Sequence, residues 1–437
     1  MHPGLLLSLL ALACLTACTH TAPTPTPNTT TVPQDPNAQA ITASIDRTLA
    51  FWHETIDHHQ GGYNTTAPNL PETKRLTLSQ ARLVWTFATA HLEGHSTPDR
   101  DYLAAARHGY RYLNQNLRDP TTHTHPWSVT PAGETIESGR DLYSLAFTIY
   151  AYSAYARAAN DPEPLNQARH LLHWIEEHLH DPTAISWHEL AEPDGTPILT
   201  QEDAEGLGGI ARPPYRSANA ILHLLEALNE YLLARPNDPL ARDMVARAHD
   251  ILTTYIYPLN PEDAAEWTLP DGQHVPDEPR ILSLGHNVEA AWLLAETDER
   301  LGRTPNLAII DTYLRHADRF ATTFIPTAVH AQSQETPKSP AERIVQPSRA
   351  VWWVQAEYLA AVAFGAERQA WPIDRAVPIL DWYQNHQIDL ETAVPYTLVN
   401  TDGEPAEGVG PSIWKAAYHD LRMRWMLRRA LNQQPQP

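Results

Sequence analysis

The chain has 437 residues, 42% of them hydrophobic, and carries a formal net charge of −21 at pH 7. A surface this acidic repels the phosphates of nucleic acids, which argues against a nucleic-acid partner. The composition suits a protein that handles a neutral small molecule. The two cysteines, Cys14 and Cys18, both precede the predicted fold, which is therefore expected to contain no disulfide.

Residues 1–18 form a predicted lipoprotein signal peptide. Residues 5–13 are an apolar run too short to span a bilayer, and small residues precede Cys18. This arrangement resembles a bacterial lipoprotein signal, in which Cys18 is lipidated and becomes the first residue of the mature chain. We therefore expect a protein of the bacterial cell envelope that faces the periplasm or the exterior and contacts the membrane only through this anchor. Residues 19–37, rich in Thr, Pro and Asn, are predicted to be a disordered linker.

Beyond the linker, apolar residues recur three and four positions apart, which predicts one all-helical domain over residues 38–433. Segments rich in Pro, Gly and Asp near 185–215 and 258–283 predict loops. The twelve expected helices lie at 41–57, 77–93, 100–116, 139–159, 165–179, 217–234, 241–256, 285–302, 306–322, 348–366, 373–386 and 411–431.

Local signals mark the starts of several of these helices. Thr77 and Gln80 form a capping-box pattern at the second helix, and Ser348 is a candidate cap for the tenth. Pro411 suits the first turn of the twelfth helix, where a missing N–H costs no hydrogen bond. Pro378 predicts a late start or a kink in the eleventh.

Twelve helices connected as six hairpins predict a barrel with six inner and six outer helices. The unusual polar and aromatic residues fall on the even-numbered helices. They are Arg82 and Trp85, Tyr143, then Asn219, His223 and Glu226, then His286 and Glu289, then Trp352, Trp353, Gln355 and Glu357, and finally Trp414, Lys415, His419 and Arg422. If the even-numbered helices form the inner layer, these side chains converge on one central cavity.

The segment 283–296 carries the clearest chemical signal. His286 and Glu289 lie three residues apart at the first turn of a helix, so the carboxylate is expected to orient the imidazole and to stabilise its protonated form. An imidazole held in this way can act as a base near neutral pH. The same spacing recurs at His223 and Glu226.

Six motifs, in order, resemble the N-acylglucosamine 2-epimerase superfamily, and within it the cellobiose 2-epimerases and mannose isomerases. They are Phe51-Trp52 with Gly61-Gly62-Tyr63, then 80–87 (Gln-Ala-Arg-Leu-Val-Trp-Thr-Phe), 219–227 (Asn-Ala-Ile-Leu-His-Leu-Leu-Glu-Ala), 285–290 (Gly-His-Asn-Val-Glu-Ala), 352–357 (Trp-Trp-Val-Gln-Ala-Glu) and 414–422 (Trp-Lys-Ala-Ala-Tyr-His-Asp-Leu-Arg). The resemblance spans residues 51–429 and implies an (α/α)6 barrel, in agreement with the helix count.

The resemblance also implies an activity. It predicts a sugar 2-epimerase or aldose–ketose isomerase that acts on a free mono- or disaccharide, without metal or cofactor, through ring opening and a histidine-mediated enediolate. It assigns the acid/base work to His286 and His419, with His419 at the sugar carbons and His286 in ring opening, or with these roles exchanged. The other expected site residues are His223, Glu289 and Arg82, the last for the developing oxyanion, together with Asn219, Glu226, Trp353, Glu357, Arg422 and Trp85 for binding and orienting the substrate, and Trp127 for stacking.

Several residues depart from the family pattern. Asn287 replaces a usual Asp, Val354 a usual Pro, Ala416-Ala417 a usual Cys-Pro, and Asp420 a usual Asn. Because both acid/base histidines are present, we interpret these changes as differences in substrate fit.

Three other functions fit parts of the sequence. A glycoside hydrolase on the same kind of barrel would take its carboxylate pair from Glu226, Glu289 and Glu357, but would leave the histidines without a role. A metal site built on the His-x-x-Glu pairs and His419 would be opposed by the nearby positive charges of Arg82 and Lys415. The third alternative is a surface lipoprotein that binds sugar without turning it over.

Overall fold

The computed structural model describes residues 36–66, 71–276, 279–332, 338–345 and 349–433. The described residues all belong to one compact unit. The predicted signal peptide, most of the predicted linker and the candidate cap Ser348 lie outside the described residues. Within the described ranges, every helix is too short or too polar to cross a membrane.

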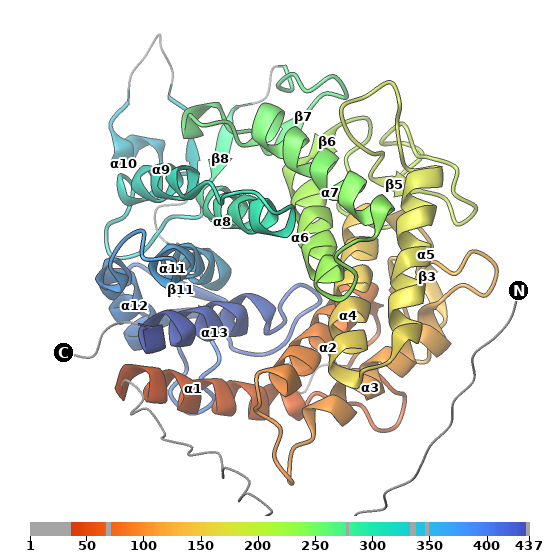
Figure 1. Ribbon diagram of the computed structural model, residues 1–437, viewed down its shortest axis with the longest axis horizontal. Coiled ribbons are helices and arrows are strands. Elements are labelled where there is room, and N and C mark those ends of the chain that lie inside the picture. The colour runs from red at the N-terminus through yellow and green to blue at the C-terminus, as the bar shows by residue number, and fades with distance from the viewer. Residues whose placement is uncertain (1–35, 67–70, 277–278, 333–337, 346–348, 434–437) are drawn as a thin grey trace, which may run out of the picture. The chain divides into compact units, whose positions relative to one another are not determined.

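Six helices form an inner ring in which each packs against the next, and the last closes against the first (Figure 1). They are α2 (Thr77–Leu92), α4 (Leu142–Ala159), α6 (Ala218–Ala234), α8 (Leu284–Arg300), α11 (Trp352–Glu367) and α13 (Tyr418–Gln433). The outer layer consists of α1 (Pro36–His53), α3 (Tyr102–Tyr112), α5 (Pro162–His178), α7 (Pro239–Ile251), α9 (Leu307–Asp318) and α12 (Val377–Trp382). The predicted (α/α)6 barrel is confirmed, with the even-numbered predicted helices inside, since α11 and α13 are the tenth and twelfth of the predicted set.

The two layers differ because of how their side chains are buried. In α4 and α11 nearly every residue is buried, since each inner helix is covered by its ring neighbours and by the outer layer. The outer helices α3 and α9 bury a single apolar stripe and leave their other side chains in water.

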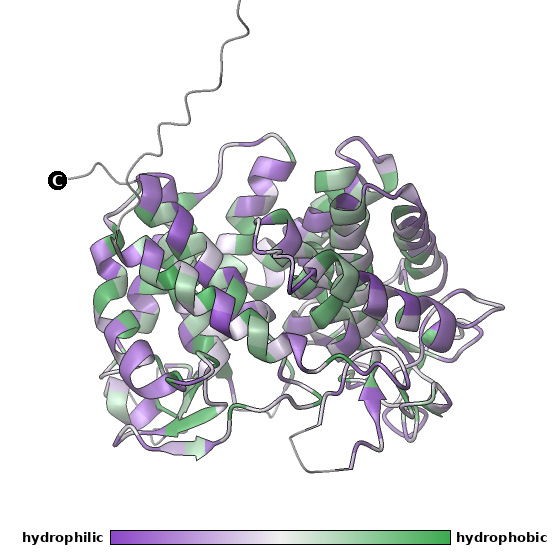
Figure 2. Ribbon diagram, turned by 90° about the horizontal axis from the view of Figure 1, so that it is seen from below, coloured by the Kyte–Doolittle hydropathy of each residue, from purple (hydrophilic) through white to green (hydrophobic). Residues whose placement is uncertain are grey.

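Short antiparallel strands fix one end of the inner helices. Five of the six inner helices begin directly after a strand, namely α2 after β1 (Arg75–Leu76), α4 after β4 (Arg140–Asp141), α6 after β6 (Arg216–Ser217), α8 after β8 (Ile281–Ser283) and α11 after β10 (Arg349–Val351). Their partners are β2 (Ser128–Val129), which also pairs β3 (Thr135–Glu137), then β5 (Leu190–Ala191), β7 (Trp267–Thr268), β9 (Ala328–His330), and β11 (Leu398–Asn400), which also pairs β12 (Pro405–Glu407). The strands drawn in Figure 2 lie along the lower edge of that view.

Side chains at the last strand residue then cap the helices. Asp141, Ser217 and Ser283 each accept a hydrogen bond from a backbone N–H in the first turn of α4, α6 and α8. This arrangement gathers the N-terminal turns of the inner helices at one end of the ring.

Two predicted start signals are wrong, although α2 begins at Thr77 as predicted. The N-cap of α2 is Leu76, which has no side-chain acceptor, and Gln80 instead exchanges two hydrogen bonds of 2.8 Å with the backbone of Tyr63. Helix α13 begins at Tyr418, not at Pro411, because the preceding segment is held in an irregular course by Lys415, whose Nζ donates to two backbone carbonyls.

The shorter elements include one confirmed prediction and one element that was not predicted. Pro378 lies in the first turn of α12, after the 3-10 turn η4 (Ile373–Ala376), which confirms the predicted late start. The short helix α10 (Pro340–Arg343) was not predicted. The outer helices α3, α7 and α12 continue as π-helical turns η1 (Leu113–Leu117), η2 (Leu252–Ile256) and η5 (Tyr383–Gln387).

Candidate active site

The first turns of the inner helices bring the three predicted histidines together. His286 of α8 lies against Trp353, with ring centroids 4.9 Å apart, and Trp353 in turn lies 5.7 Å from His419 of α13. His223 of α6 packs against Phe147, which also contacts the ring of Tyr418, the neighbour of His419. A continuous set of ring contacts therefore links all three imidazoles at one end of the barrel.

Each of these imidazoles is held by a carboxylate at the same ring nitrogen. The Nδ1 atoms lie 2.8 Å from Glu226 in His223, 2.9 Å from Glu266 in His286, and 2.6 Å from Glu357 in His419. Within the described residues, none of the three Nε2 atoms has a hydrogen-bond partner. A carboxylate on Nδ1 places the proton there, so Nε2 is left as the free basic nitrogen of the neutral ring.

The partner of His286 differs from the predicted one. Glu289 lies three residues away on the same helix, as expected, but His286 instead contacts Glu266, which directly precedes β7. The backbone carbonyl of Glu266 accepts from the N–H of Ala218 at the start of α6, so the β6–β7 pairing holds this loop residue in place. No local sequence pattern marked Glu266 as a site residue.

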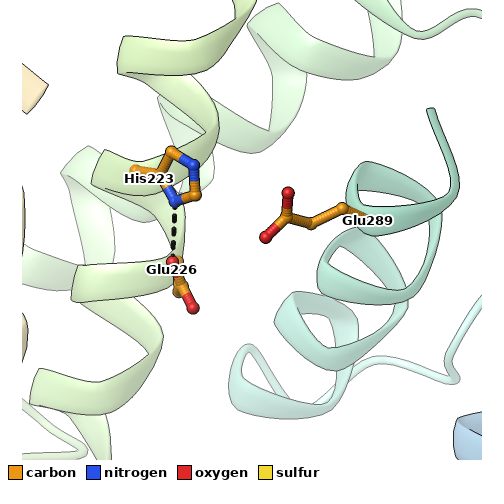
Figure 3. Close-up of side chains that lie close together, drawn as sticks. All are labelled: His223, Glu226 and Glu289. Atoms are coloured by element: carbon orange, nitrogen blue, oxygen red, sulfur yellow. Dashed lines mark hydrogen bonds and ion pairs between the residues drawn. The ribbon is translucent and has the colours of Figure 1, made fainter. Parts of the chain in front are cut away.

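Glu289 is bound to Arg422, together with two other buried glutamates. One nitrogen of the Arg422 guanidinium lies 2.8 Å from both Glu289 and Glu357, and the other contacts Glu226. Figure 3 shows Glu289 reaching from α8 toward the pair of His223 and Glu226 on α6. Arg422 was expected to bind substrate, but its two terminal nitrogens are already occupied by these carboxylates, and its side chain is almost fully buried.

This arrangement links both buried histidines to one guanidinium. Glu226 bridges Arg422 to His223, and Glu357 bridges Arg422 to His419. Glu289 lies between them, because one of its oxygens is within 4.8 Å of a ring nitrogen of each histidine. The second oxygen of Glu289 is buried without a hydrogen-bond partner among the described residues.

Burial shifts the pKa values of these groups. Desolvation, followed by the positive charge of Arg82, holds the pKa values of His223 and His419 well below 6.5, so both rings are neutral bases. Burial and the neighbouring charge of Glu357 raise the pKa of Glu289. Burial also raises the pKa of Glu357, but its oxygens accept from Trp292, Arg422 and His419, and these contacts favour its ionised form. Glu289 is thus the carboxyl expected to carry a proton.

Arg82 provides the positive charge beside the histidines. It donates to Tyr143 Oη at 2.5 Å and to the backbone carbonyl of Trp414 at 2.9 Å, and its guanidinium lies over the rings of Phe147 and Tyr418. Its Nε has no hydrogen-bond partner among the described residues. Tyr143 was expected inside the barrel, and the structure adds its contacts with Arg82 and His223.

Of the remaining predicted residues, Asn219 and Trp127 lie near the histidines, whereas Trp85 does not. Asn219 lies in the first turn of α6, half-buried, and its Oδ1 lacks a hydrogen-bond partner within the described residues. Trp127 lies 5.9 Å from Trp414, which is 43% exposed and precedes α13 rather than belonging to it. Trp85 stacks on Tyr150 and lines a cavity on the other side of Arg422, away from the histidines.

Two sets of side chains have the composition of a cation site: His223, Glu226 and Glu289, and Glu289, Glu357 and His419. All three glutamates already share the Arg422 guanidinium, which would repel a cation placed between them. Lys415, which was expected to oppose a metal, faces the carbonyls of Pro395 and Val409 instead. The opposing charge comes from Arg422 and, as predicted, from Arg82.

Comparisons with known proteins agree with this geometry. Residues 61–422 match the family model of N-acylglucosamine 2-epimerase. The chain is 23% identical to a cellobiose 2-epimerase of Bacteroides fragilis and 26% identical to one of Ruminococcus albus, in both cases over 86% of this chain and 94% of the relative. It is 24% identical to a D-mannose isomerase of Marinomonas mediterranea over 87% of this chain and 94% of that protein.

Solved structures give the same result. The cellobiose 2-epimerase of Spirochaeta thermophila superposes with a TM-score of 0.77 at 26% identity, covering 90% of this chain and 96% of that one. A β-1,3-1,4-glucanase from Paenibacillus reaches a TM-score of 0.55 at 9% identity over 91% of this chain and 93% of its own, which is a likeness of fold alone. The chain therefore belongs to the N-acylglucosamine 2-epimerase family, whose members similar to it are carbohydrate epimerases and isomerases.

Proposed function

We propose that this protein is a sugar 2-epimerase or aldose–ketose isomerase that acts on a free mono- or disaccharide. The observation that carries the proposal is the set of three imidazoles, each with Nδ1 on a carboxylate and Nε2 unpaired, beside Arg82. Moving the proton at C2 requires bases of this kind on both sides of the carbon, and a positive group where the oxyanion develops.

Ring opening comes first, because the hydrogen at C2 is acidic only next to a free carbonyl. The bond between C1 and the ring oxygen breaks as His286, held by Glu266, takes the proton of the anomeric hydroxyl at its Nε2 and the ring oxygen takes a proton from solvent. His223 on α6 is placed to bind a sugar hydroxyl, since its Nδ1 is on Glu226 and its Nε2 has no hydrogen bond to a described residue. Asn219, in the first turn of the same helix, is proposed to assist it.

Proton transfer at carbon follows. The neutral Nε2 of His419 removes the hydrogen at C2, and the electron pair moves to the carbonyl oxygen to form an enediolate. Arg82 can stabilise this negative charge through its guanidinium, in a site where low polarity strengthens the interaction. Glu357 stabilises the imidazolium that forms on His419, and Arg422 holds Glu357 in position.

The enediolate then decides the product. A proton returned to C2 on the opposite face, from His286, gives the epimer, whereas a proton delivered to C1 gives the ketose. Trp353 lies between His286 and His419 and holds both rings at a fixed separation. At the mouth, the exposed Trp414 beside Trp127 offers an apolar face on which a second sugar ring can stack.

A hydrolase is less well supported by this geometry. Its two carboxyl groups must flank a glycosidic bond, but Glu226, Glu289 and Glu357 all face Arg422 and are buried. The third alternative, a protein that binds sugar without turning it over, would leave the three carboxylate-held imidazoles without a function. Chromatography after incubation with cellobiose, glucose and mannose distinguishes the three: epimerised or isomerised sugar, cleaved cellobiose, or unchanged sugar.

We further propose that Cys18 anchors the protein in the bacterial cell envelope through a lipid. The short apolar run of residues 5–13, followed by small residues before a cysteine, supports this proposal. The Pro- and Thr-rich segment of residues 19–37 then serves as a tether that keeps the barrel off the membrane surface.

Turnover in heavy water should introduce deuterium into the product, at C2 of an epimer or at C1 of a ketose, because the transferred proton passes through a histidine that exchanges with solvent. His419→Ala should abolish both deuterium uptake and product formation. NMR and mass spectrometry of the product measure the label. His173→Ala, which removes an exposed histidine of the outer helix α5, is the matched control. Unchanged turnover in His419→Ala would rule out its role as the base.

Replacing Glu266 should impair the enzyme more than its loop position suggests. Glu266→Ala removes the acceptor on Nδ1 of His286, so kcat should fall about tenfold or more. This loss is smaller than the full contribution of a general acid–base group, because the imidazole itself remains. Glu266→Gln keeps a carbonyl acceptor and should recover part of the loss. Steady-state kinetics on the three proteins test this, and equal rates for all of them would show that Glu266 does not position His286.

The pH profile should reflect the buried bases. Since burial and Arg82 lower the pKa of His419 well below 6.5, the ring stays unprotonated at pH 6.5, and kcat/KM should begin to fall only at a clearly lower pH. Arg82→Gln removes the positive charge that lowers this pKa, so the pKa of His419 should rise. NMR titration of labelled histidines measures it even if turnover is lost. A wild-type acid limb at or above pH 6.5 would contradict the assignment.

The anchor is tested in cells. Wild-type protein should partition into membranes and incorporate labelled fatty acid, whereas Cys18→Ser should do neither. Cys14→Ser is the matched control and should behave as wild type, because that residue lies inside the predicted signal peptide. Soluble cytoplasmic protein with an intact N-terminus would disprove this part of the proposal.

A further inference from the structure

A second cavity, of about 240 Å³, lies on the opposite side of Arg422 from the histidines. Every inner helix contributes residues to its wall, mostly from the middle or the C-terminal half of the helix. The histidines, in contrast, lie in or near the first turns of their helices. Its lining includes Trp85, Tyr150, Glu230, Glu296, Phe364 and Arg422. Contributions from all six helices place this cavity on the axis of the barrel, at the end away from the catalytic groups.

One hydroxyl at this cavity has no protein partner among the described residues. Tyr150 is only 5% exposed, yet its hydroxyl makes no hydrogen bond to any described residue, and it interacts electrostatically with Arg422, Glu230 and Glu296. Because buried polar groups nearly always have partners, a hydroxyl left free beside a hollow indicates that a ligand fills it.

The charges of the wall are already balanced. Arg157 lies 2.5 Å from Glu230, Arg300 lies 3.0 Å from Glu296, and Arg429 contacts Glu93 at 3.2 Å. These pairs leave no unopposed charge to select an ion, since a bound cation or anion would have to break one of them. Their unused lone pairs and N–H groups can still bond a neutral molecule.

The rest of the wall combines aromatic rings with aliphatic side chains such as Leu233 and Met426. Trp85 stacks on Tyr150 and packs edge-on against Trp425, and Trp292 lies beneath the Arg422 guanidinium. Flat rings next to carboxylates and guanidinium groups suit the C–H faces and hydroxyl groups of a polyol. The volume is below the roughly 300 Å³ at which pockets accept drug-sized ligands, so it admits a single ring or a short chain.

We propose that this cavity is a second, non-catalytic site for one small neutral polyhydroxyl compound, held by Tyr150, Glu296 and Arg300. The site is separated from the histidines by Arg422 and its three glutamates, so it requires no turnover and does not rest on the proposed reaction. A monosaccharide and glycerol share the chemistry that the wall recognises.

Calorimetry on the full chain tests the site with methyl α-D-glucoside and, in a separate titration, with glycerol. The glucoside cannot open its ring and is therefore not turned over. We expect two binding events for the glucoside, of which Trp353→Ala weakens only the catalytic one. Tyr150→Phe and Glu296→Gln, which preserve shape, should each weaken the other event at least tenfold, about 1.4 kcal/mol. A tenfold loss with both probes identifies a general polyol site, and a loss with the glucoside alone identifies a sugar site.

Two further variants complete the design. Thr89→Trp adds a ring to the cavity wall and should remove the second event, while far-UV circular dichroism checks that the barrel is intact. Tyr255→Phe, an exposed tyrosine of η2, is the matched control and should bind as wild type. The proposal is overturned by a single glucoside event that Trp353→Ala abolishes, by a second event that persists in Thr89→Trp, or by crystals grown with each probe in which the cavity holds only water.

Discussion

The guanidinium of Arg422, shared by three buried glutamates, is the interaction on which the rest of the site depends. Burying one carboxylate without a partner costs several kcal/mol, and here Glu226, Glu289 and Glu357 lie together in a place that water hardly reaches. Arg422 makes this possible by contacting all three. Because two of them then hold His223 and His419 at Nδ1, the orientation of both imidazoles follows from one side chain of α13.

Close packing around the histidines adds to this control. Gly285 directly precedes His286, and a Cβ at that position would come within 2.4 Å of the Trp353 ring. The absence of a side chain there lets Trp353 approach α8 and lie between His286 and His419. The neighbouring Asn287 is buried, and neither polar atom of its amide has a partner in the described structure, so the change from the usual Asp at this position removes a buried charge without adding a contact.

The barrel is divided along its axis by the same cluster of charges. On one side, strands and capping residues gather the first turns of the inner helices, where unpaired imidazole nitrogens and Arg82 make a reactive surface. On the other side, the arginines and glutamates of the cavity wall are paired with each other, and no histidine contributes to the wall. One ring of helices thus has a basic, reactive end and a charge-neutral end, because Arg422 and its carboxylates fill the space between them.

The sequence by itself determined the helices, their alternation between layers and the residues that face inward. Inner helices are buried on all sides and outer helices along one stripe, and these two kinds of burial leave different apolar patterns in the sequence. It also determined the pairing of His223 with Glu226, which lie on one face of a helix. The identical spacing of His286 and Glu289 did not produce the same pair. Helix geometry makes such residues neighbours, but Arg422 from α13 attracts Glu289 away, and Glu266 from a loop takes its place. Only the tertiary structure decided which partner each carboxylate has, because charges from distant segments compete for it, and the start of α13 was set by the contacts of Lys415 rather than by Pro411.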